Sequence, residues 1–239
     1  GSGTQLFEGG GGIDTYVIDL GNFNLRDDFV GQVNLRTNFS GDQANPDHEL
    51  NDEIYNIENI TLIGEHDFFL IGDDKDNIII GGTGDDEITG GGGDDRLEGG
   101  GGRDVFYAGG GDDTIIFASG DNENWDYGRY YSGSGNDTID FSGEWGFINY
   151  DYLPEEALNA VLINLTDNQQ TLDGVTLEAN TARDQFGNTD SFLNISKGGH
   201  FWGSQGNDTL IADKNFYFTA MQGGDDKLTI IGGAPLGTL

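Results

Sequence analysis

Aspartate recurs at an interval of nine residues through the middle of the chain. Residues 81–116 read GGTGDDEIT GGGGDDRLE GGGGRDVFY AGGGDDTII when they are divided into nonapeptides, and the sixth position is always an acid: Asp86, Asp95, Asp104 and Asp113. Glycine fills most of the first four positions of each nonapeptide, and its carbonyl oxygens can crowd together because no Cβ separates them. Carboxylate and carbonyl oxygens are the ligands that Ca²⁺ takes, usually six to eight at a time. The spacing therefore predicts calcium-binding turns.

The eighth position of each nonapeptide is apolar, and this predicts the elements that position the acids. Three residues around it are long enough for a very short strand, and the glycine-rich residues before it suit a tight turn, in which glycine adopts positive φ without steric cost. Two such units would make one coil of a solenoid, with the apolar side chains stacked inside as ladders. This apolar set is Leu70, Ile79, Ile88, Leu97, Phe106 and Ile115.

Residues 18 apart should lie on the same side of this solenoid, one coil apart. Asp86 is therefore predicted to face Asp104, and Asp95 to face Asp113. An all-oxygen ligand set, with no His or Cys in the turns, favours Ca²⁺ over zinc, and Mg²⁺ would demand a tighter octahedral geometry. Because paired acids recur in every turn, we interpret them as ligands rather than as a general acid and base, and we expect no enzymatic activity.

Composition narrows the class of protein further. The 239 residues include 43 acids, 10 bases and 42 glycines, for a formal net charge of −33. A chain with this charge repels itself unless cations belong to the fold, while 35% hydrophobic and 11% aromatic residues argue against permanent disorder. The charge also excludes nucleic acid and anionic membranes as partners. No cysteine is present, and no apolar stretch is long enough for membrane insertion.

The nonapeptides resemble the G-G-x-G-x-D-x-U-x repeat of the RTX (repeats-in-toxin, hemolysin-type) family, with three successive full matches and a fourth that has Ala108 in the first position. The resemblance implies an all-β, right-handed parallel β-roll with several Ca²⁺ ions between its turns. It also implies export in an unfolded state by type I secretion. The opening GSG and the closing GGAPLGTL lead us to expect a piece of a longer protein.

Isolated nonapeptides extend the pattern to residues 9–17, 132–140, 203–211 and 221–229. The segment GDDKDNIII departs from it, because Lys75 takes a glycine position and Asn77 the acid position. This turn is expected either to bind weakly or to mark the edge of the roll, with neighbouring acids available to compensate. The predicted calcium ligands are Gly9, Gly11, Asp14, Asp74, Asn77, Gly82, Gly84, Asp86, Gly91, Gly93, Asp95, Gly100, Gly102, Asp104, Gly109, Gly111, Asp113, Gly135, Asp137, Gly206, Asp208, Gly224 and Asp226.

A second, longer repeat suggests how the chain is organised. The segment from Val33 to Gly64 resembles the segment from Ile163 to Gly203, and each runs into nonapeptides. We therefore expect strand–loop–strand lead-ins that feed two rolls. The predicted division is a first repeat with its lead-in (1–62), a central β-roll (63–120), an aromatic-rich insert (121–160), a second lead-in (161–202) and a second short β-roll (203–239).

The predicted insert concentrates large aromatic residues next to acids, with one short helix expected at Pro154–Ala160. Two interpretations remain open. The aromatic side chains could cap the end of a roll, as solenoids require, and this is the favoured one. They could instead contact a glycan or a peptide; the candidate contacts are Trp125, Tyr130, Trp145 and Tyr150.

Three functions fit these patterns. The first is a non-enzymatic calcium-binding module of a secreted or cell-surface bacterial protein, such as an adhesin, that folds on calcium binding after export. The second is a calcium-dependent glycan- or peptide-binding module. The third is an accessory domain of a secreted enzyme whose catalytic part lies elsewhere.

Overall fold

The computed structural model describes residues 6–19, 31–36, 39–42, 52–117, 129–141, 146–149, 161–184, 187–194, 199–212, 218–220 and 223–231. Among these residues there are strands and turns but no helix, and hence no helix that could cross a membrane. The helix predicted at 154–160 lies outside the described residues. The prediction of an all-β protein is confirmed.

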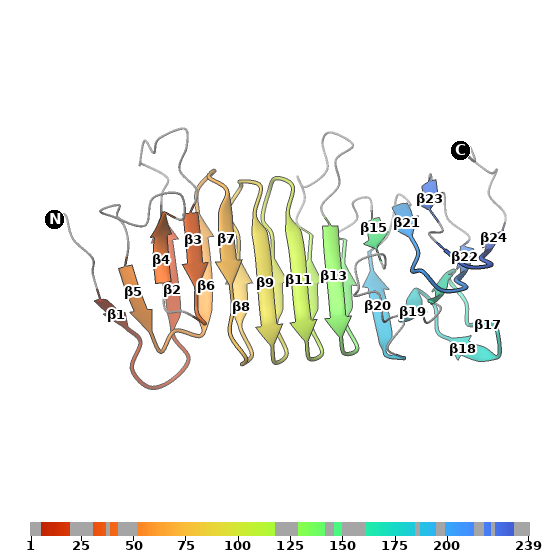
Figure 1. The fold of residues 1–239 in the computed structure, drawn as a ribbon, viewed down its shortest axis with the longest axis horizontal. Coiled ribbons are helices and arrows are strands. Elements are labelled where there is room, and N and C mark those ends of the chain that lie inside the picture. The colour runs from red at the N-terminus through yellow and green to blue at the C-terminus, as the bar shows by residue number, and fades with distance from the viewer. Residues whose placement is uncertain are drawn as a thin grey trace.

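One of the two large sheets has eight strands, which run in succession from the N-terminal end of the molecule (Figure 1). In spatial order they are β1 (Leu6–Glu8), β5 (Asp52–Tyr55), β4 (Phe39–Asp42), β3 (Gly31–Asn34), β7 (Phe68–Ile71), β9 (Glu87–Gly92), β11 (Val105–Gly110) and β13 (Arg129–Ser134).

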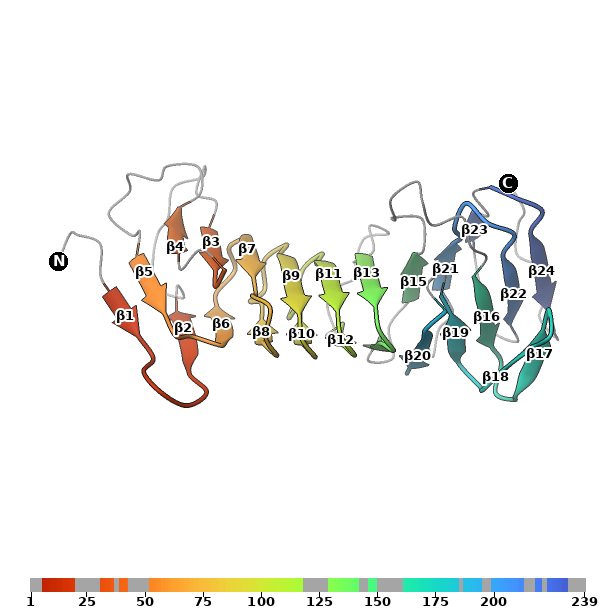
Figure 2. The same ribbon diagram turned by 60° about the horizontal axis from the view of Figure 1, so that its bottom comes forward.

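The other large sheet has eleven strands and extends to the C-terminal end of the molecule (Figure 2). Its order is β2 (Thr15–Asp19), β6 (Asn59–Ile63), β8 (Ile78–Ile80), β10 (Arg96–Glu98), β12 (Thr114–Ile116), β14 (Thr138–Asp140), β20 (Thr189–Leu193), β19 (Thr181–Arg183), β16 (Leu162–Leu165), β22 (Thr209–Ala212) and β24 (Lys227–Ile230). Two small sheets complete the fold: β15 (Gly146–Asn149), β21 (Gly199–Trp202) and β23 (Phe218–Ala220) form one, and β17 (Gln170–Leu172) and β18 (Val175–Leu177) form the other.

The central chain alternates between the two large sheets, one nonapeptide in each. In the eleven-stranded sheet β8 pairs with β10 in parallel, with Ile79 opposite Leu97. In the eight-stranded sheet β9 pairs with β11, also in parallel, with Ile88 opposite Phe106. Partners are thus 18 residues apart, two nonapeptides make one coil, and the predicted parallel β-roll is confirmed.

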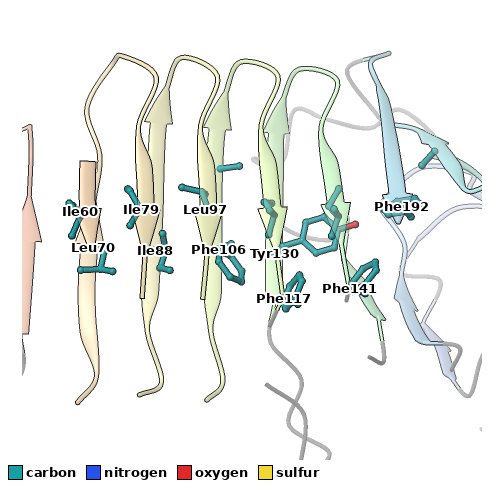
Figure 3. Packing of buried hydrophobic residues seen from close by; sticks show 14 of the residues in the cluster. Ile60, Leu70, Ile79, Ile88, Leu97, Phe106, Phe117, Tyr130, Phe141 and Phe192 are labelled. Carbon is teal, nitrogen blue, oxygen red and sulfur yellow. The ribbon is translucent and has the colours of Figure 1, made fainter. Parts of the chain in front are cut away.

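Eighth-position side chains fill the space between the sheets in two ladders (Figure 3). All six of the predicted ladder residues have no exposed surface. Burial of each such side chain contributes about 2 kcal/mol, and no coil can bury its own without a neighbour. The core is therefore continuous along the roll, as the nine-residue period predicts.

Part of the segment expected to be an insert belongs to the roll. Strands β13 and β14 continue the two sheets, and Tyr130 pairs with Phe106 as the next residue of the ladder. Tyr130 is fully buried, with its ring centroid 6.3 Å from those of both Phe117 and Phe141. The prediction that Tyr130 contacts a ligand at the surface is therefore wrong. The other three candidate contacts (Trp125, Trp145 and Tyr150) lie outside the described residues.

Two further ladder positions are filled by segments without the glycine run. Ile60 pairs with Ile79 at the N-terminal side of the roll, and Phe192 pairs with Ile139 at the other side. Just before Ile60, Asn56 has a φ of 52°; asparagine tolerates this left-handed conformation better than most residues. Both segments keep an acid two residues before the ladder residue, Glu58 and Asp190.

The C-terminal part departs from a simple roll. Strand β19 is antiparallel to both β16 and β20, while β16, β22 and β24 are parallel to one another. These strands belong to the same sheet as the central coils, so hydrogen bonding is continuous across the predicted boundary at residue 161.

Candidate calcium site

The sixth-position residues on one side of the roll form a row, which we call the Asn77 row: Asn77, Asp95, Asp113, Asp137 and Asp190. In this row each backbone N–H donates to Oδ1 of the acid one coil further on. The N···O distance is 2.7 Å from Asn77 to Asp95 and 2.8 Å from Asp95 to Asp113. It is 2.9 Å from Asp113 to Asp137 and 3.2 Å from Asp137 to Asp190. The opposite side repeats the arrangement, with 2.9 Å from the N–H of Asp86 to Oδ1 of Asp104. The acids predicted to face each other do so.

The second carboxylate oxygen of three acids in the Asn77 row has no hydrogen-bond donor. Asp95, Asp113 and Asp137 are between 1% and 2% exposed, and Oδ2 of each is buried without a hydrogen-bond partner. A buried oxygen of this kind costs free energy unless a proton or a cation compensates it. Three successive coils on this side of the roll share this arrangement, whereas on the opposite side Oδ2 of Asp86 accepts the N–H of Gly82 at 3.1 Å.

Peptide oxygens converge on these carboxylates. A Cβ atom added to Gly90 would collide with Oδ2 of Asp95 and would lie 2.5 Å from the carbonyl oxygen of Ala108, one coil further on. Two acceptors that approach one point with no donor between them suit a cation. Glycine in the first position of the nonapeptide keeps that point free, and Gly93 in the fourth position adopts a φ of 95° that closes the turn.

Burial also changes the protonation of the row. Desolvation raises the pKa of Asp95 to about 7, of Asp113 to about 6 and of Asp137 to about 8. The same cause raises the pKa of Asp86 to about 7. These carboxylates resist ionisation near neutral pH when no cation accompanies them, and a bound divalent ion would reverse this preference.

The fifth position has a structural role that our sequence interpretation missed. On the Asn77 side, Oδ1 of Asp94 accepts from the N–H of Asp112 at 2.9 Å, so fifth-position side chains reach forward along the roll while sixth-position side chains reach back. On the opposite side, Arg103 binds Asp85 through its backbone and its guanidinium. Burial acts to raise the pKa of Asp85, but these contacts with Arg103 outweigh burial and lower the pKa overall. The frequent Asp and Asn at this position were the available signal.

The predicted ligands at the ends of the chain have different surroundings. Asp14 also has an unbonded, buried Oδ2. The N–H of Asp208 donates to Oδ1 of Asp226 at 2.9 Å, which repeats the central geometry. Asp74 is exposed and pairs with Arg36 at 3.2 Å, away from the Asn77 row.

Peptide carbonyls must complete any calcium shell. The described residues contain no cluster of three or more His, Cys, Asp or Glu side chains that could hold a metal ion. Most of the predicted glycine ligands lie between strands: Gly9, Gly11, Gly82, Gly84, Gly93, Gly100, Gly102, Gly111, Gly135, Gly206 and Gly224. Gly91 and Gly109 instead lie near the ends of β9 and β11, and the carbonyl oxygen of Gly82 accepts the N–H of Gly101 at 3.0 Å. Carboxylate and carbonyl oxygens together are a donor set that fits Ca²⁺.

Comparison with known proteins agrees with this donor set. A family model described as "RTX calcium-binding nonapeptide repeat (4 copies)" matches residues 71–106, 89–123 and 200–214. The matches cover most of the central coils and the turn before β22. No curated protein matches the chain.

Proposed function

Because the chain carries RTX calcium-binding nonapeptide repeats in a parallel β-roll, we propose that it is a structural calcium module of a secreted or cell-surface bacterial protein, adhesin-like and without enzymatic activity. It folds when it meets calcium outside the cell. The observation that carries this proposal is the set of buried, unbonded Oδ2 atoms of Asp95, Asp113 and Asp137.

The proposed ligands are the sixth-position carboxylates and the carbonyl groups of the glycine turns. The carboxylates of Asp95, Asp113 and Asp137 are fixed in orientation by the coil that precedes each of them. Oδ1 of each accepts a backbone N–H from that coil, and Oδ2 is directed away from this bond. Calcium, when bound, supplies the positive charge that these oxygens lack. The row is pre-oriented by the roll, and the ion in turn makes the roll stable.

Coupling of binding to folding follows from charge. The chain has a net charge of −33, and its acids are brought within one coil of each other only in the folded state. Ligands that bind the folded state alone stabilise it by mass action. A chain that stays unfolded at low intracellular calcium and folds in extracellular calcium suits secretion in an unfolded state.

Calorimetric titration with CaCl₂, paired with circular dichroism, tests the proposal. We expect several ions to bind cooperatively and β-structure to appear with them. Asp113→Asn removes one charge but keeps the shape of the side chain, and should reduce the number of ions bound. Glu98→Gln removes a charge on the outer face, where Glu98 pairs with Arg96 at 3.1 Å, and should leave binding unchanged. A chain that folds fully in EDTA and takes up no calcium would contradict the proposal.

A further inference from the structure

The first turn of the Asn77 row differs from the turns that follow it. Residues 72–77, which we call the Lys75 turn, have aspartate at the second and third positions, lysine at the fourth and asparagine at the sixth, where the later turns of the row have three glycines and an aspartate. From the sequence alone, this turn looks like a repeat that has diverged from the consensus. In the structure the substituted residues bond to one another.

Asn77 uses both ends of its amide. Its Oδ1 accepts from the N–H of Asp73 at 2.8 Å, and its Nδ2 donates to the carbonyl oxygen of Glu58 at 2.7 Å and to Oδ1 of Asp73 at 3.3 Å. Asn77 is 1% exposed. Oδ1 of Asn77 takes the position of the unbonded Oδ2 of Asp95, since a Cβ atom added to Gly72 would collide with it and with the carbonyl oxygen of Gly90. Unlike the oxygen of Asp95, it is uncharged and has a donor, the N–H of Asp73. Nδ2 takes the position of the other carboxylate oxygen and adds a donor where an acid would have an acceptor.

Lys75 brings a positive charge to the same turn. Its Nζ lies 3.6 Å from Oε1 of Glu58 and 3.6 Å from Oδ2 of Asp73. The lysine side chain is 60% exposed, so these ion pairs are weak by themselves. They place a positive charge beside the carboxylates of Glu58 and Asp73, while the N–H of Asp73 supplies Asn77 with the donor that Oδ2 of the later acids lacks.

We propose that Asn77 and Lys75 exclude calcium from the Lys75 turn and replace it, so that the coil from β6 to β8 stays formed without the ion and provides the edge on which the calcium-dependent coils assemble. This inference rests on the proposed calcium function of the later turns. It assigns Asn77 the role of a calcium-excluding residue instead of the ligand role expected from the sequence, and it identifies Lys75 as the built-in cation.

The ion count is the first test. Lys75→Gly combined with Asn77→Asp restores the fourth-position glycine and the sixth-position acid of the repeat, and we expect this double variant to bind one Ca²⁺ more than the parent chain in calorimetry and native mass spectrometry. Arg96→Gln is the matched control, since it also removes an exposed cation, and it should bind the parent number. If the parent binds calcium but the double variant gains no ion, the inference is wrong. If the parent binds none, the proposed function itself fails.

Hydrogen exchange of the parent chain in EDTA is the second test, and it does not depend on the folding of a variant. We expect the amides of β6 and β8 to stay protected at least ten times longer than those of β10, β12 and β14. Asn77→Asp alone should abolish this difference, because it places an uncompensated carboxylate next to the Glu58 carbonyl group. Equal exchange of β8 and β12 in the parent would overturn the inference.

Discussion

Asp113 in the central roll and Asp208 in the C-terminal coil hold the same position of their nonapeptides, yet their carboxylates have different partners. Asp113 accepts one backbone N–H at Oδ1 and nothing at Oδ2. Asp208 accepts the N–H of Val161 at 2.8 Å and the hydroxyl of Ser204 at 2.7 Å on Oδ1, and the N–H of Ser204 at 2.7 Å on Oδ2. Both side chains are buried.

The second position of the repeat accounts for part of this difference. Ser204 stands where the central nonapeptides have glycine, and its hydroxyl adds a donor to Oδ1 of the acid. The donor to Oδ2 is a backbone N–H, which a glycine can also supply, as Gly82 does to Asp86 at 3.1 Å. Asp208 therefore has protein donors on both oxygens, whereas Asp95, Asp113 and Asp137 have none on Oδ2. A repeat family can keep its acid and still vary how much each coil needs calcium.

Chelation of calcium should produce the largest difference in hydrogen-exchange protection between the two regions. In EDTA we expect β9 to β14 to lose protection from hydrogen exchange completely, because their carboxylates repel one another without compensation. Strands β16 and β22, held by the hydrogen bonds of Asp208, should exchange more slowly. Simultaneous loss of protection in both regions would show that they form one cooperative unit.

Removal of one acid should produce the second-largest difference, because the loss of stability should depend on the region that loses the acid. In saturating calcium, Asp95→Ala is expected to lower the free energy of unfolding by about 3–5 kcal/mol, because a charged site loses a partner. Asp208→Ala should cost only about 1–3 kcal/mol, the range for buried hydrogen-bond donors that lose their acceptor. Urea unfolding monitored by circular dichroism measures both. Equal losses would mean that Asp208 is also an ion ligand.

Truncation of ladder residues compares the packing of the two regions. Leu97 has no exposed surface, whereas Leu228, in the same position of its nonapeptide, is 42% exposed. We expect Leu97→Ala to cost about 3 kcal/mol and Leu228→Ala to cost about 1 kcal/mol, since less apolar surface is buried there. Thermal unfolding in excess calcium gives the two values, and a larger loss at Leu228 would contradict the described burial.

The pH dependence of the calcium-free chain tests the raised pKa values of the central acids. Folded-state pKa values of about 7 for Asp95, 6 for Asp113 and 8 for Asp137 exceed the value of about 3.9 for an unfolded aspartate. Their contribution to stability is therefore fully present below about pH 4 and is lost as the pH rises through 6 to 8.

The β-structure that circular dichroism detects in EDTA should accordingly be greater at pH 5 than at pH 8.5. In saturating calcium the trend should reverse, because protons compete with the ion for the same oxygens. A β-structure content in EDTA that rises with pH would show that the central acids ionise without cost.

Glu98→Ala should have the smallest effect. Glu98 is the ninth residue of its nonapeptide, and it pairs with Arg96 on the outer face of β10. Exposed pairs of this kind contribute at most about 1 kcal/mol. The number of calcium ions, measured by calorimetry, should not change, and a lost ion would refute the assignment of ninth-position residues to the outer face.

The regular repeats could be predicted from sequence because one physical requirement acts at each position. The eighth position must be apolar to fill the ladder, so Ile88 and Leu97 identified the inner face directly. Tyr130 was missed because no glycine run marks its turn, although it lies nine residues before Ile139 and so keeps the period. The period of the core residues is a more durable signal than the chemistry of the turns.

The hydrogen bonds of the site were less accessible to sequence reasoning. Asn77 looked like a weakened ligand because the identity of a residue does not tell which partners its amide will find, and Glu58 is 19 residues away in the chain. Fifth-position residues varied among Asp, Asn and Arg, so no single chemistry identified their role. Such contacts depend on which coils become neighbours, and that is a property of the assembled roll.

The direction of the bonds between coils has a mechanical consequence. Strands lie across the long axis of the roll, and the bonds between neighbouring strands run along it (Figure 1). Tension applied to the two ends therefore loads one inter-coil contact after another, and the coils peel instead of shearing together. Partners in the central coils are 18 residues apart, so each detached coil releases about 60 Å of extended chain. A roll of this kind lengthens in steps under load, one coil at a time.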